Sequence, residues 1–279
     1  MNYRHGFHAG NFADAFKHAL LARILVHLLR KDAPFRVVDT HAGEGDYDLS
    51  SDEAERTGEW RDGVGRLDEL VAPVEIAALL EPYLTRLGPF RGGRPERYPG
   101  SPRLAQSFLR DDDRAIFCEL RPDAFDMLRQ NFARDKRIKT LHLDGYTGAG
   151  AFLPPKERRG LVLIDPPFER TDEFSAMFAA FHGAYRKWPT GIYALWHPVK
   201  DGARARAFYE AFRKQDIRRV LRLELCVGGS GEKLDRTGLA VINPPYTLAA
   251  EARALLPFFA ERLAQGQGAG WEVEEVTGE

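Results

Sequence analysis

Apolar residues recur along this chain with two periods, one typical of helices and the other typical of buried strands. Short runs of branched and aromatic residues predict seven strands, at 35–41, 114–120, 138–144, 160–165, 191–196, 219–227 and 239–242. Segments with helical spacing lie between them, at 122–134, 146–152, 173–187, 203–215 and 247–263. Strands that alternate with helices in this way predict a Rossmann-like, doubly wound α/β fold with a seven-stranded, mostly parallel sheet.

The chain opens with a polar and aromatic stretch that leads into a predicted helix. Asn11 is a favourable N-cap, and Asp14 places a negative charge in the first turn, where it suits the helix dipole. Apolar residues repeat every four positions and predict an amphipathic helix to about residue 30: Phe16, Leu20, Ile24 and Leu28. His18 lies beside this stripe. From the pattern alone it is either a histidine at a packing edge or a ligand-binding residue.

The strand predicted at 160–165 ends at two prolines, and this end carries a clear sign of chemistry. Prolines donate no hydrogen bond to a ladder, so Asp165 must lie at the carboxyl end of the strand, where open α/β sheets bind ligands. The Asp165 carboxylate and the Pro166 carbonyl could each accept one N–H of an amino group conjugated with a ring, while Phe168 stacks on that ring. The alternative is an aspartate that only caps a helix, with the prolines as a stop signal.

The first predicted strand runs directly into a short glycine loop, Ala42-Gly43-Glu44-Gly45. Glycines at these positions let the backbone approach a ligand closely, as in the fingerprint of dinucleotide-binding folds. We therefore expect Gly43 to contact a cofactor. His41, at the end of the same strand, either faces the ligand or caps the turn.

Acidic residues end the next strands at positions where this fold binds a nucleoside. Glu119 ends the second strand and can bind both hydroxyls of a ribose. Asp144 ends the third strand and can accept a hydrogen bond from an adenine amino group, and the adjoining Gly145 leaves room for the base. With the glycine loop before them and Asp-Pro-Pro-Phe after them, these acids indicate an S-adenosylmethionine site beside a site for a flat amine. The predicted reaction is methyl transfer by a Rossmann-like class I methyltransferase.

The segment between the glycine loop and residue 101 is longer than this fold requires. It holds helical patterns near 52–70 and 74–87 and then a loop at 88–100, whereas a crossover needs only about a dozen residues. We therefore divide the chain into residues 1–46, an inserted helical subdomain at 47–100, and the rest of the methyltransferase domain at 101–279. Arginines and aromatic residues alternate in the insertion, as on RNA-facing surfaces. Because acids nearly neutralise its helices, we expect RNA contacts in its basic loop, at Arg91 and Arg94.

A second Pro-Pro motif, Asn243-Pro244-Pro245-Tyr246, follows the last predicted strand. That strand is expected at the far edge of the sheet, beyond the strand at 219–227. The strand that ends at Asp165 instead neighbours the strand of the glycine loop. We therefore assign the chemistry to Asp165 and expect Asn243 only to terminate its strand.

Composition and charge limit the partners of the protein. The chain has 279 residues, of which 44% are hydrophobic and 29% charged, and its formal net charge is -1. Any contact with nucleic acid must therefore depend on a local basic surface. No apolar run is long enough to span a membrane, and the polar start is no signal peptide. We expect a cytoplasmic protein with no membrane association and no obligate protein partner.

Neither the cysteines nor the histidines match a metal site. Cys118 and Cys226 lie in apolar runs and match no ligand spacing, which indicates buried, reduced thiols. Four histidines lie in the first part of the chain: His5, His8, His18 and His41. No cysteine or matched carboxylate stands at ligand spacing to them, so we predict no metal.

With these residues in view, the chain resembles the ribosomal RNA large subunit methyltransferase J family over essentially its whole length. The motifs that carry the resemblance are YRHGFHAGNFADAFKH, DTHAGEG, AERTGEW, RYPGSP, CELRP, LDGY, LIDPPF, YALWHPV and VINPPY. The opening motif and RYPGSP are far more specific than a glycine loop. The resemblance implies a helical subdomain inserted after the first strand. It also implies methylation of the N6 amine of a specific adenine in 23S ribosomal RNA, with S-adenosylmethionine as the methyl donor.

The resemblance further implies roles for individual residues. Seven positions match contacts to S-adenosylmethionine in the family: His18, His41, Ser101, Glu119, Asp144, Gly145 and Asp165. Asp165 also matches the proton acceptor, and Tyr3 matches a tail residue that touches the RNA. Arg4 stands beside Tyr3 in the tail and is a further candidate RNA contact. Phe168 departs from the tyrosine that the family commonly has there, so stacking is kept but any hydrogen bond from a hydroxyl is lost.

Three other functions fit parts of the same pattern. Adenine in DNA and the amide of a protein glutamine are also methylated by enzymes with Asn/Asp-Pro-Pro-aromatic motifs. A non-catalytic RNA-binding assembly factor with a relict pocket would bind RNA but not S-adenosylmethionine. The arginine-rich loop and the whole-chain resemblance favour RNA, and the complete set of acids favours catalysis.

Overall fold

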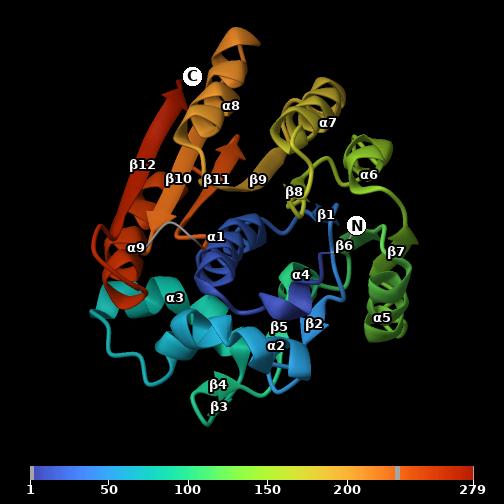
Figure 1. The fold of residues 1–279 in the computed structure, drawn as a ribbon. Coiled ribbons are helices and arrows are strands. Elements are labelled where there is room, and N and C mark those ends of the chain that lie inside the picture. Colours follow the sequence, from blue (N-terminus) through green and yellow to red (C-terminus); the bar gives the residue numbers. More distant parts are fainter. Residues whose placement is uncertain (1–2, 230–232, 279) are drawn as a thin grey trace.

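An eight-stranded sheet forms the centre of the protein in the computed structural model, which describes residues 3–229 and 233–278 (Figure 1). From one edge to the other its strands are β12 (Gly270–Thr277), β10 (Val220–Cys226), β11 (Arg236–Ile242), β9 (Ile192–Pro198), β8 (Gly160–Ile164), β1 (Arg36–Asp39), β6 (Arg114–Glu119) and β7 (Ile138–His142). The strands from β9 to β7 pair in parallel, and β11, β10 and β12 pair antiparallel. The predicted α/β class and the mostly parallel, Rossmann-like sheet are confirmed.

The edge strand β12 makes the predicted number of seven strands wrong by one. In this strand Trp271 and Val273 alternate with glutamates. The sequence did not predict a strand here because a segment with several acids is equally typical of a solvated tail. Its Glu272 and Glu274 pair with Arg222 of β10, at 3.2 Å and 3.1 Å. These cross-strand ion pairs add to the antiparallel backbone pairing of β12 with β10, and they depend on a neighbour 50 residues away in the chain.

The position of β11 also differs from the prediction. This strand does not lie at the far edge of the sheet but between β9 and β10, antiparallel to both. Asn243, at its end, therefore lies at the edge where the parallel strands begin, opposite to Asp165. There the Asn243 side chain donates to the carbonyls of Pro189 and Gly191, at 2.7 Å and 2.8 Å. The prediction failed because a β10–β11 hairpin has the same sequence pattern whichever of its strands pairs with β9.

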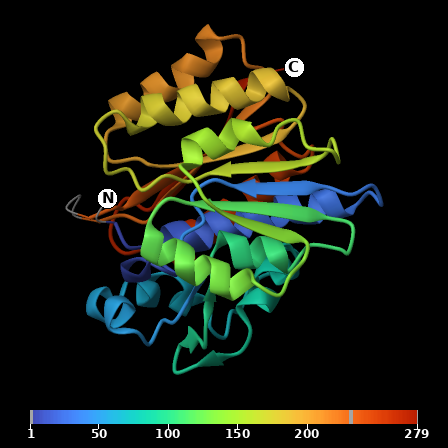
Figure 2. The ribbon, with the colours of Figure 1, turned by 90° about the vertical axis from the view of Figure 1, so that its right-hand side faces the viewer.

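Helices cover both faces of the sheet (Figure 2). One face carries α6 (Gly145–Ala151), α7 (Glu173–Lys187) and α8 (Gly202–Lys214). The other face carries α1 (Phe12–Leu29), α4 (Ser101–Gln106), α5 (Pro122–Phe132) and α9 (Leu248–Arg262). A parallel sheet covered on both faces requires apolar strands, which is why β8 is buried at every position. Within the described ranges, no helix has both the length and the apolar character of a membrane span.

Helix α1 is buried on almost every side, so its predicted amphipathic character is wrong. Its predicted start is confirmed, because the Asn11 side chain accepts a hydrogen bond from the Asp14 amide at 2.9 Å. Fifteen of its 18 residues are buried, including Asp14, Lys17 and His18. Elements of the insertion and α9 pack on the sides of α1 that a surface helix would expose to solvent.

The insertion folds as a helical layer beneath α1 (Figure 1). It contains α2 (Asp52–Thr57), 3-10 turns at Glu59–Asp62 and Val64–Leu67, and α3 (Val74–Leu87). The short strands β2 (Asp46–Tyr47) and β5 (Tyr98–Pro99) pair with each other, and β3 (Phe90–Arg91) and β4 (Arg94–Pro95) form a hairpin. The helix predicted near 52–70 is wrong as one continuous element, because Gly58 adopts a left-handed φ of 63° and ends α2.

Candidate active site

A cleft of about 850 Å³ opens at the carboxyl ends of the parallel strands. Its volume lies in the range of pockets that bind cofactors and small ligands. Most of the residues that the sequence singles out line this cleft: Tyr3, His18, His41, Gly43, Ser101, Glu119, Asp144, Gly145, Asp165, Pro166 and Phe168. They come from the N-terminal segment, from α1 and α4, and from the ends of β1, β6, β7 and β8, so the fold brings distant parts of the chain to one site.

The glycine loop is fixed to the end of β6 through Glu119. The Gly43 amide donates to Glu119 Oε2 at 2.8 Å, and the Arg121 amide donates to Oε1 at 2.7 Å. Gly43 has a φ of 58°, and a Cβ atom there would lie 2.2 Å from the Tyr47 hydroxyl. The loop therefore exposes backbone on the wall of the cleft, and the Glu119 carboxylate is held beside it.

Helix α6 begins at Gly145, directly beside the ring of His41. The Asp144 side chain caps this helix by accepting a hydrogen bond from the Thr147 amide at 2.9 Å. A Cβ atom on Gly145 would lie 2.2 Å from the Thr40 carbonyl oxygen and 2.6 Å from His41 Cε1, so only glycine fits. Burial lowers the pKa of His41 to about 4, and its imidazole is neutral at physiological pH.

His18 is buried beneath the cleft with only one of its ring nitrogens paired. Nδ1 lies 2.7 Å from the Tyr98 hydroxyl, and the residue is 1% exposed. Burial lowers the pKa of His18 to about 3, so this ring is also neutral. Its Nε2 atom has no hydrogen-bond partner within the part of the chain that is described, although His18 lines the cleft. A buried nitrogen without a partner is suited to a polar group of a ligand.

Ser101 is held by a buried carboxyl group that the sequence does not single out. The Ser101 hydroxyl donates to Asp39 Oδ2 at 2.6 Å, and Asp39 is 1% exposed. Burial raises the pKa of Asp39 to about 7, against the opposing effect of the Ser101 hydrogen bond. Because the Ser101 hydroxyl donates its hydrogen bond to Asp39, its oxygen can accept a hydrogen bond from a ligand in the cleft.

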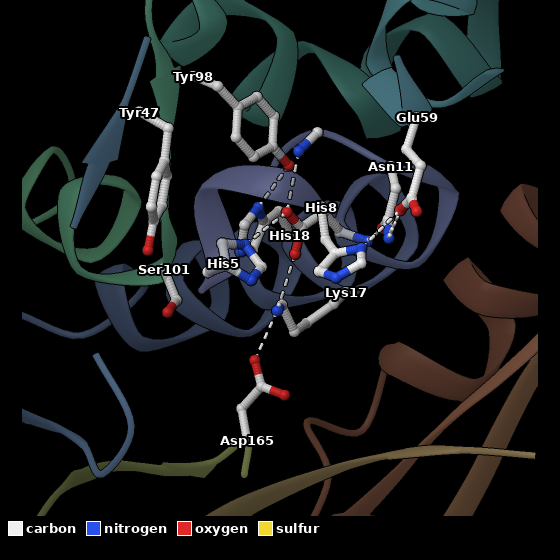
Figure 3. Close-up of polar contacts among 12 residues, drawn as sticks. His5, His8, Asn11, Lys17, His18, Tyr47, Glu59, Tyr98, Ser101 and Asp165 are labelled. Carbon is white, nitrogen blue, oxygen red and sulfur yellow. Dashed lines mark hydrogen bonds and ion pairs between the residues drawn. The ribbon is translucent and has the colours of Figure 1, made fainter. Parts of the chain in front are cut away.

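Asp165 belongs to a chain of buried charges that starts in α1 (Figure 3). Lys17 Nζ lies 2.5 Å from Asp165 Oδ2 and 2.9 Å from Asp14 Oδ1. Asp14 Oδ2 accepts a hydrogen bond from the Gly10 amide at 3.0 Å and lies 2.9 Å from His5 Nε2. Burial lowers the pKa of Lys17, but the two carboxylates outweigh burial and raise it above its ordinary value. Lys17 is therefore charged, and it fixes the direction of the Asp165 carboxylate.

The N-terminal segment is tied into the cleft through Tyr3. The Tyr3 hydroxyl lies 2.8 Å from His5 Nδ1, and its ring stacks on His8 with centroids 5.4 Å apart and planes 8° from parallel. The Tyr3 amide donates to Glu169 Oε1 at 2.6 Å. This bond joins the segment to the turn that follows Asp165, so the predicted RNA contact and the predicted catalytic residues share one cavity.

Two aromatic rings form the wall that follows the prolines. Phe168 has a φ of 51°, which is uncommon for a residue with a side chain. Its ring meets Phe174 and Trp196 edge-on, with centroid distances of 5.0 Å and 5.9 Å. Phe168 and Trp196 both line the cleft, and Lys17 Nζ lies 5.7 Å from the Trp196 ring. A flat aromatic substrate would find apolar surface close to a carboxylate here.

Arg4, Arg91 and Arg94 are not among the residues that line the cleft within the described ranges. Arg4 pairs with Glu53 at 2.9 Å, and Arg94 pairs with Glu55. Arg91 is exposed and lies opposite Arg94 in the β3–β4 hairpin. Their contacts with RNA stay predictions, and carboxylates of the insertion already pair with two of the three.

Lys17 and Trp196 are site residues that sequence reasoning missed, and Asp14 was interpreted only as a charge in the first turn of a helix. The sequence contained one indication of the pair formed by Asp14 and Lys17. Asp14 and Lys17 stand three positions apart in a segment that is otherwise mostly apolar, and charges on a buried helix have to be paired. The second partner of Lys17, Asp165, lies 148 residues later in the chain, and no local pattern predicts that contact.

Comparisons with known proteins show the family to which the chain belongs. A family model described as "Ribosomal RNA large subunit methyltransferase D, RlmJ" matches residues 32–277. Two proteins named Ribosomal RNA large subunit methyltransferase J are similar to the chain. The one from Haemophilus influenzae is 40% identical over 283 residues and 100% of both chains, and the one from Escherichia coli is 39% identical over 266 residues and 94% of both. The crystal structure of a Legionella pneumophila protein matches with a TM-score of 0.87 at 33% identity, over 96% of this chain and 98% of that one. The resemblance inferred from the sequence is confirmed, and the chain belongs to the ribosomal RNA large subunit methyltransferase family RlmJ.

Proposed function

We propose that this protein transfers a methyl group from S-adenosylmethionine to the N6 amine of a specific adenine in 23S ribosomal RNA. One observation carries the proposal. The cleft that holds Asp165, Pro166 and Phe168 also holds the Gly43 loop and the two acids at the ends of β6 and β7. The family supports ribosomal RNA as the substrate, and the Asp-Pro-Pro-Phe end of β8 supports an amine as the acceptor.

The residues of the cleft fit the groups of S-adenosylmethionine. Glu119 is placed for the ribose hydroxyls and Asp144 for the amino group of the adenine, since a carboxylate can accept several hydrogen bonds at once. Gly145 leaves space for the base, because any larger residue would strike the His41 ring. The unpaired Nε2 of His18 is suited to a polar group of the cofactor. When bound, S-adenosylmethionine supplies a methyl group attached to a positively charged sulfur, which is a strong electrophile.

The residues at the end of β8 prepare the acceptor amine. The nitrogen lone pair of an exocyclic amine is delocalised into the adenine ring, so the free amine is a poor nucleophile. The Asp165 carboxylate and the Pro166 carbonyl each accept one of its two N–H groups and thereby aim the lone pair. Phe168 holds the flat base by stacking, and Trp196, whose ring plane stands at 78° to that of Phe168, can contact the same base only edge-on. Asp165, or a water molecule, takes the proton that the nitrogen loses once its new bond to carbon has formed.

Lys17 keeps the Asp165 carboxylate in position. Its ammonium group binds Asp165 Oδ2 and Asp14 Oδ1 together, and the pair is held inside the protein by α1. Since Oδ2 is engaged by Lys17, we place the amine on Oδ1. The orientation of the acceptor is therefore set before the substrate arrives.

A base of a folded RNA can enter this cleft only after it leaves its stack, as base-modifying enzymes require. Tyr3 and Arg4 in the N-terminal segment and Arg91 and Arg94 on the insertion are the proposed RNA contacts. Tyr3 already lies in the cleft, stacked on His8. Because the proposed substrate is ribosomal RNA, the expected compartment is the cytoplasm.

A methylation assay with defined acceptors tests this function. The purified protein is incubated with methyl-labelled S-adenosylmethionine and a 23S transcript, DNA of the same sequence, or a glutamine-containing peptide. We expect label only in the transcript, as N6-methyladenosine at one position located by mass spectrometry. Label in the DNA or the peptide alone would contradict the RNA substrate. RNA binding without any calorimetric signal for S-adenosylmethionine would instead show a non-catalytic assembly factor.

A further inference from the structure

A second cavity lies at the edge of the sheet opposite to the active-site cleft. It has a volume of about 430 Å³ and is bordered by Leu28 at the end of α1, by Gly160 and Ile192 at the starts of β8 and β9, and by Asn243 after β11. The second Pro-Pro motif of the sequence, Asn243-Pro244-Pro245-Tyr246, forms one of its walls. The proposed methyl transfer makes no use of this cavity or of that motif.

Positively charged side chains line the cavity, and no carboxylate stands among the described residues of its lining. Its lining contains Lys31, Arg158, Arg159 and Arg219 and no aspartate or glutamate among the described residues. None of these four cations has an ion-pair partner in that part of the chain, whereas Arg4 in the N-terminal segment and Arg94 and Arg97 in the insertion pair with acids. Arg159 donates to the carbonyls of Leu28 and Ala33, and Arg219 donates to the Pro244 carbonyl at 3.5 Å.

Burial and the positive charge at this cavity both lower the pKa of the neighbouring His27. Burial lowers the pKa of His27 at the cavity wall, and Arg30, Arg159 and Lys31 lower it further. Glu251 acts in the opposite direction on the pKa of His27, but its carboxylate is already bound by Arg23 at 2.9 Å and 3.0 Å. Like charges held close together create a local positive potential that attracts an anionic partner, although the net charge of the protein is -1.

An exposed aromatic ring stands at the rim of the cavity. Tyr246 is 77% exposed. Its hydroxyl accepts a hydrogen bond from Arg30 at 2.7 Å, the Arg30 guanidinium lies 5.6 Å from its ring centre, and His27 meets the ring edge-on. The preceding prolines and the two hydrogen bonds of Asn243 to the backbone before β9 fix the loop that carries it. The ring is therefore held in place while much of its surface faces solvent.

We propose that this cavity is a second RNA-binding site, in which Lys31, Arg158, Arg159 and Arg219 hold backbone phosphates and Tyr246 stacks on a base. Unpaired cations beside an exposed aromatic ring are the combination that binds single-stranded or distorted RNA. The five residues of β8 span about 17 Å at roughly 3.3 Å per residue, so an RNA that reaches both sites extends well beyond the target base. This inference rests on the proposed function, since it assigns the second site to the same substrate.

Charge-matched variants test the second site. Lys31→Gln, Arg158→Gln and Arg219→Gln together remove three exposed cations from the cavity. The control is Lys139→Gln, Arg206→Gln and Lys214→Gln, three exposed cations on β7 and α8 that also have no ion-pair partner among the described residues. Arg159 is left unchanged because its hydrogen bonds hold the loop between α1 and β1. Thermal melts establish that both triple variants fold.

Each variant is assayed with a full 23S transcript and with a short stem-loop that carries the target adenine. We expect the cavity variant to raise KM for the full transcript by about tenfold at 150 mM salt, with kcat unchanged, and to leave the stem-loop kinetics unaltered. Its slope of log affinity against log salt should fall in magnitude by about 2, since each lost phosphate contact contributes roughly 0.7. The control should match the wild type with both RNAs. Tyr246→Ala should raise KM for the full transcript alone, by about fivefold or more.

The inference is overturned if the cavity variant matches the control on the full transcript, or if both RNAs lose affinity equally. A rise in KM confined to ribosomal particles, with naked RNA unaffected, would assign the cavity to a ribosomal protein and would also overturn it. The two proposals fail separately. If the wild type methylates neither RNA, the proposed function is wrong. If the wild type methylates both and the cavity variant equals the control, only the second site is wrong.

Discussion

At the scale of the residue, burial decides which side chains of the cleft carry charge. His18 and His41 are neutral because burial lowers the pKa of each, to about 3 and about 4. Lys17 is charged because two carboxylates outweigh its burial. The site therefore offers neutral imidazoles where we place the cofactor and a fixed ion pair where we place the amine.

Replacing Asp165 with alanine should lower turnover by roughly 10²–10⁴-fold, since it removes the group that orients the amine and takes its proton. Lys17 keeps its contact with Asp14, so the fold should persist, which a thermal melt checks. Initial rates of label transfer to the short stem-loop measure the effect. Asn243→Ala is the contrasting variant, and its turnover should stay near that of the wild type. Loss of turnover in Asn243→Ala but not in Asp165→Ala would reverse the assignment of the two Pro-Pro motifs.

Asp39 should make stability fall as pH rises. Burial raises its pKa from 3.8 to about 7, so the folded state favours the protonated carboxyl. The contribution of Asp39 to stability is complete below its pKa in the unfolded state. It is lost as pH rises through its pKa in the folded state. Asp39→Asn keeps an acceptor for Ser101 but cannot ionise. The free energy of unfolding of the wild type, relative to this variant, should fall by about 2–3 kcal/mol between pH 5 and pH 8 in urea titrations. A difference that does not change with pH would contradict the assigned ionisation.

At the scale of the element, the sequence predicts best those segments whose pattern follows from their own burial and caps. Strand β8 is apolar and buried at all positions, and it ends just before Asp165 and the prolines, as predicted. Helix α1 begins after Asn11 for the local reason that the sequence shows. The burial of α1 on its other sides is set by the insertion and α9, and β12 is set by its pairing with β10, so no local pattern predicts either.

Gly145 at the start of α6 should tolerate no side chain. In Gly145→Ala the new Cβ would meet the Thr40 carbonyl and the His41 ring, at 2.2 Å and 2.6 Å, so backbone has to move. We expect a loss of about 1–3 kcal/mol in the free energy of unfolding and binding of S-adenosylmethionine weaker by about tenfold or more in calorimetry. Gly183→Ala in α7 is the matched control. Its Cβ meets nothing within 4 Å, and it should stabilise the protein by about 0.5–1 kcal/mol. Equal affinity of the two variants for S-adenosylmethionine would show that the cofactor does not bind beside Gly145.

A buried ion pair joins α9 to α1 within their apolar contact. Arg23 donates to both oxygens of Glu251, at 2.9 Å and 3.0 Å, and the two side chains are only 9% and 11% exposed. Arg23→Met leaves a buried carboxylate without its partner and should lower the free energy of unfolding by about 3–5 kcal/mol. The double variant Arg23→Met, Glu251→Leu should recover most of that loss. If urea titrations show the double variant to be as unstable as the single one, the loss comes from removing the ion pair itself and not from an unpaired buried carboxylate.

At the scale of the whole molecule, the position of the site could be predicted from the sequence, but the contacts between its residues could not. Acids and glycines at the ends of successive parallel strands must meet at one edge of the sheet, and the cleft lies there. The contact between Lys17 and Asp165 joins residues 148 apart, and the place of β11 depends on which strand of a hairpin pairs with β9. Both are properties of the tertiary fold. The corrected place of β11 puts the second Pro-Pro motif at the opposite edge of the sheet, beside the cationic cavity.

A crystal structure of the protein with S-adenosylhomocysteine, the product left after the methyl group has been transferred, tests the central claim most directly. We predict that its sulfur lies on the Asp165 side of the cleft, with the ribose on Glu119 and the adenine amino group on Asp144. A sulfur atom near Tyr246, or a ligand bound away from the carboxyl ends of the parallel strands, would contradict the account.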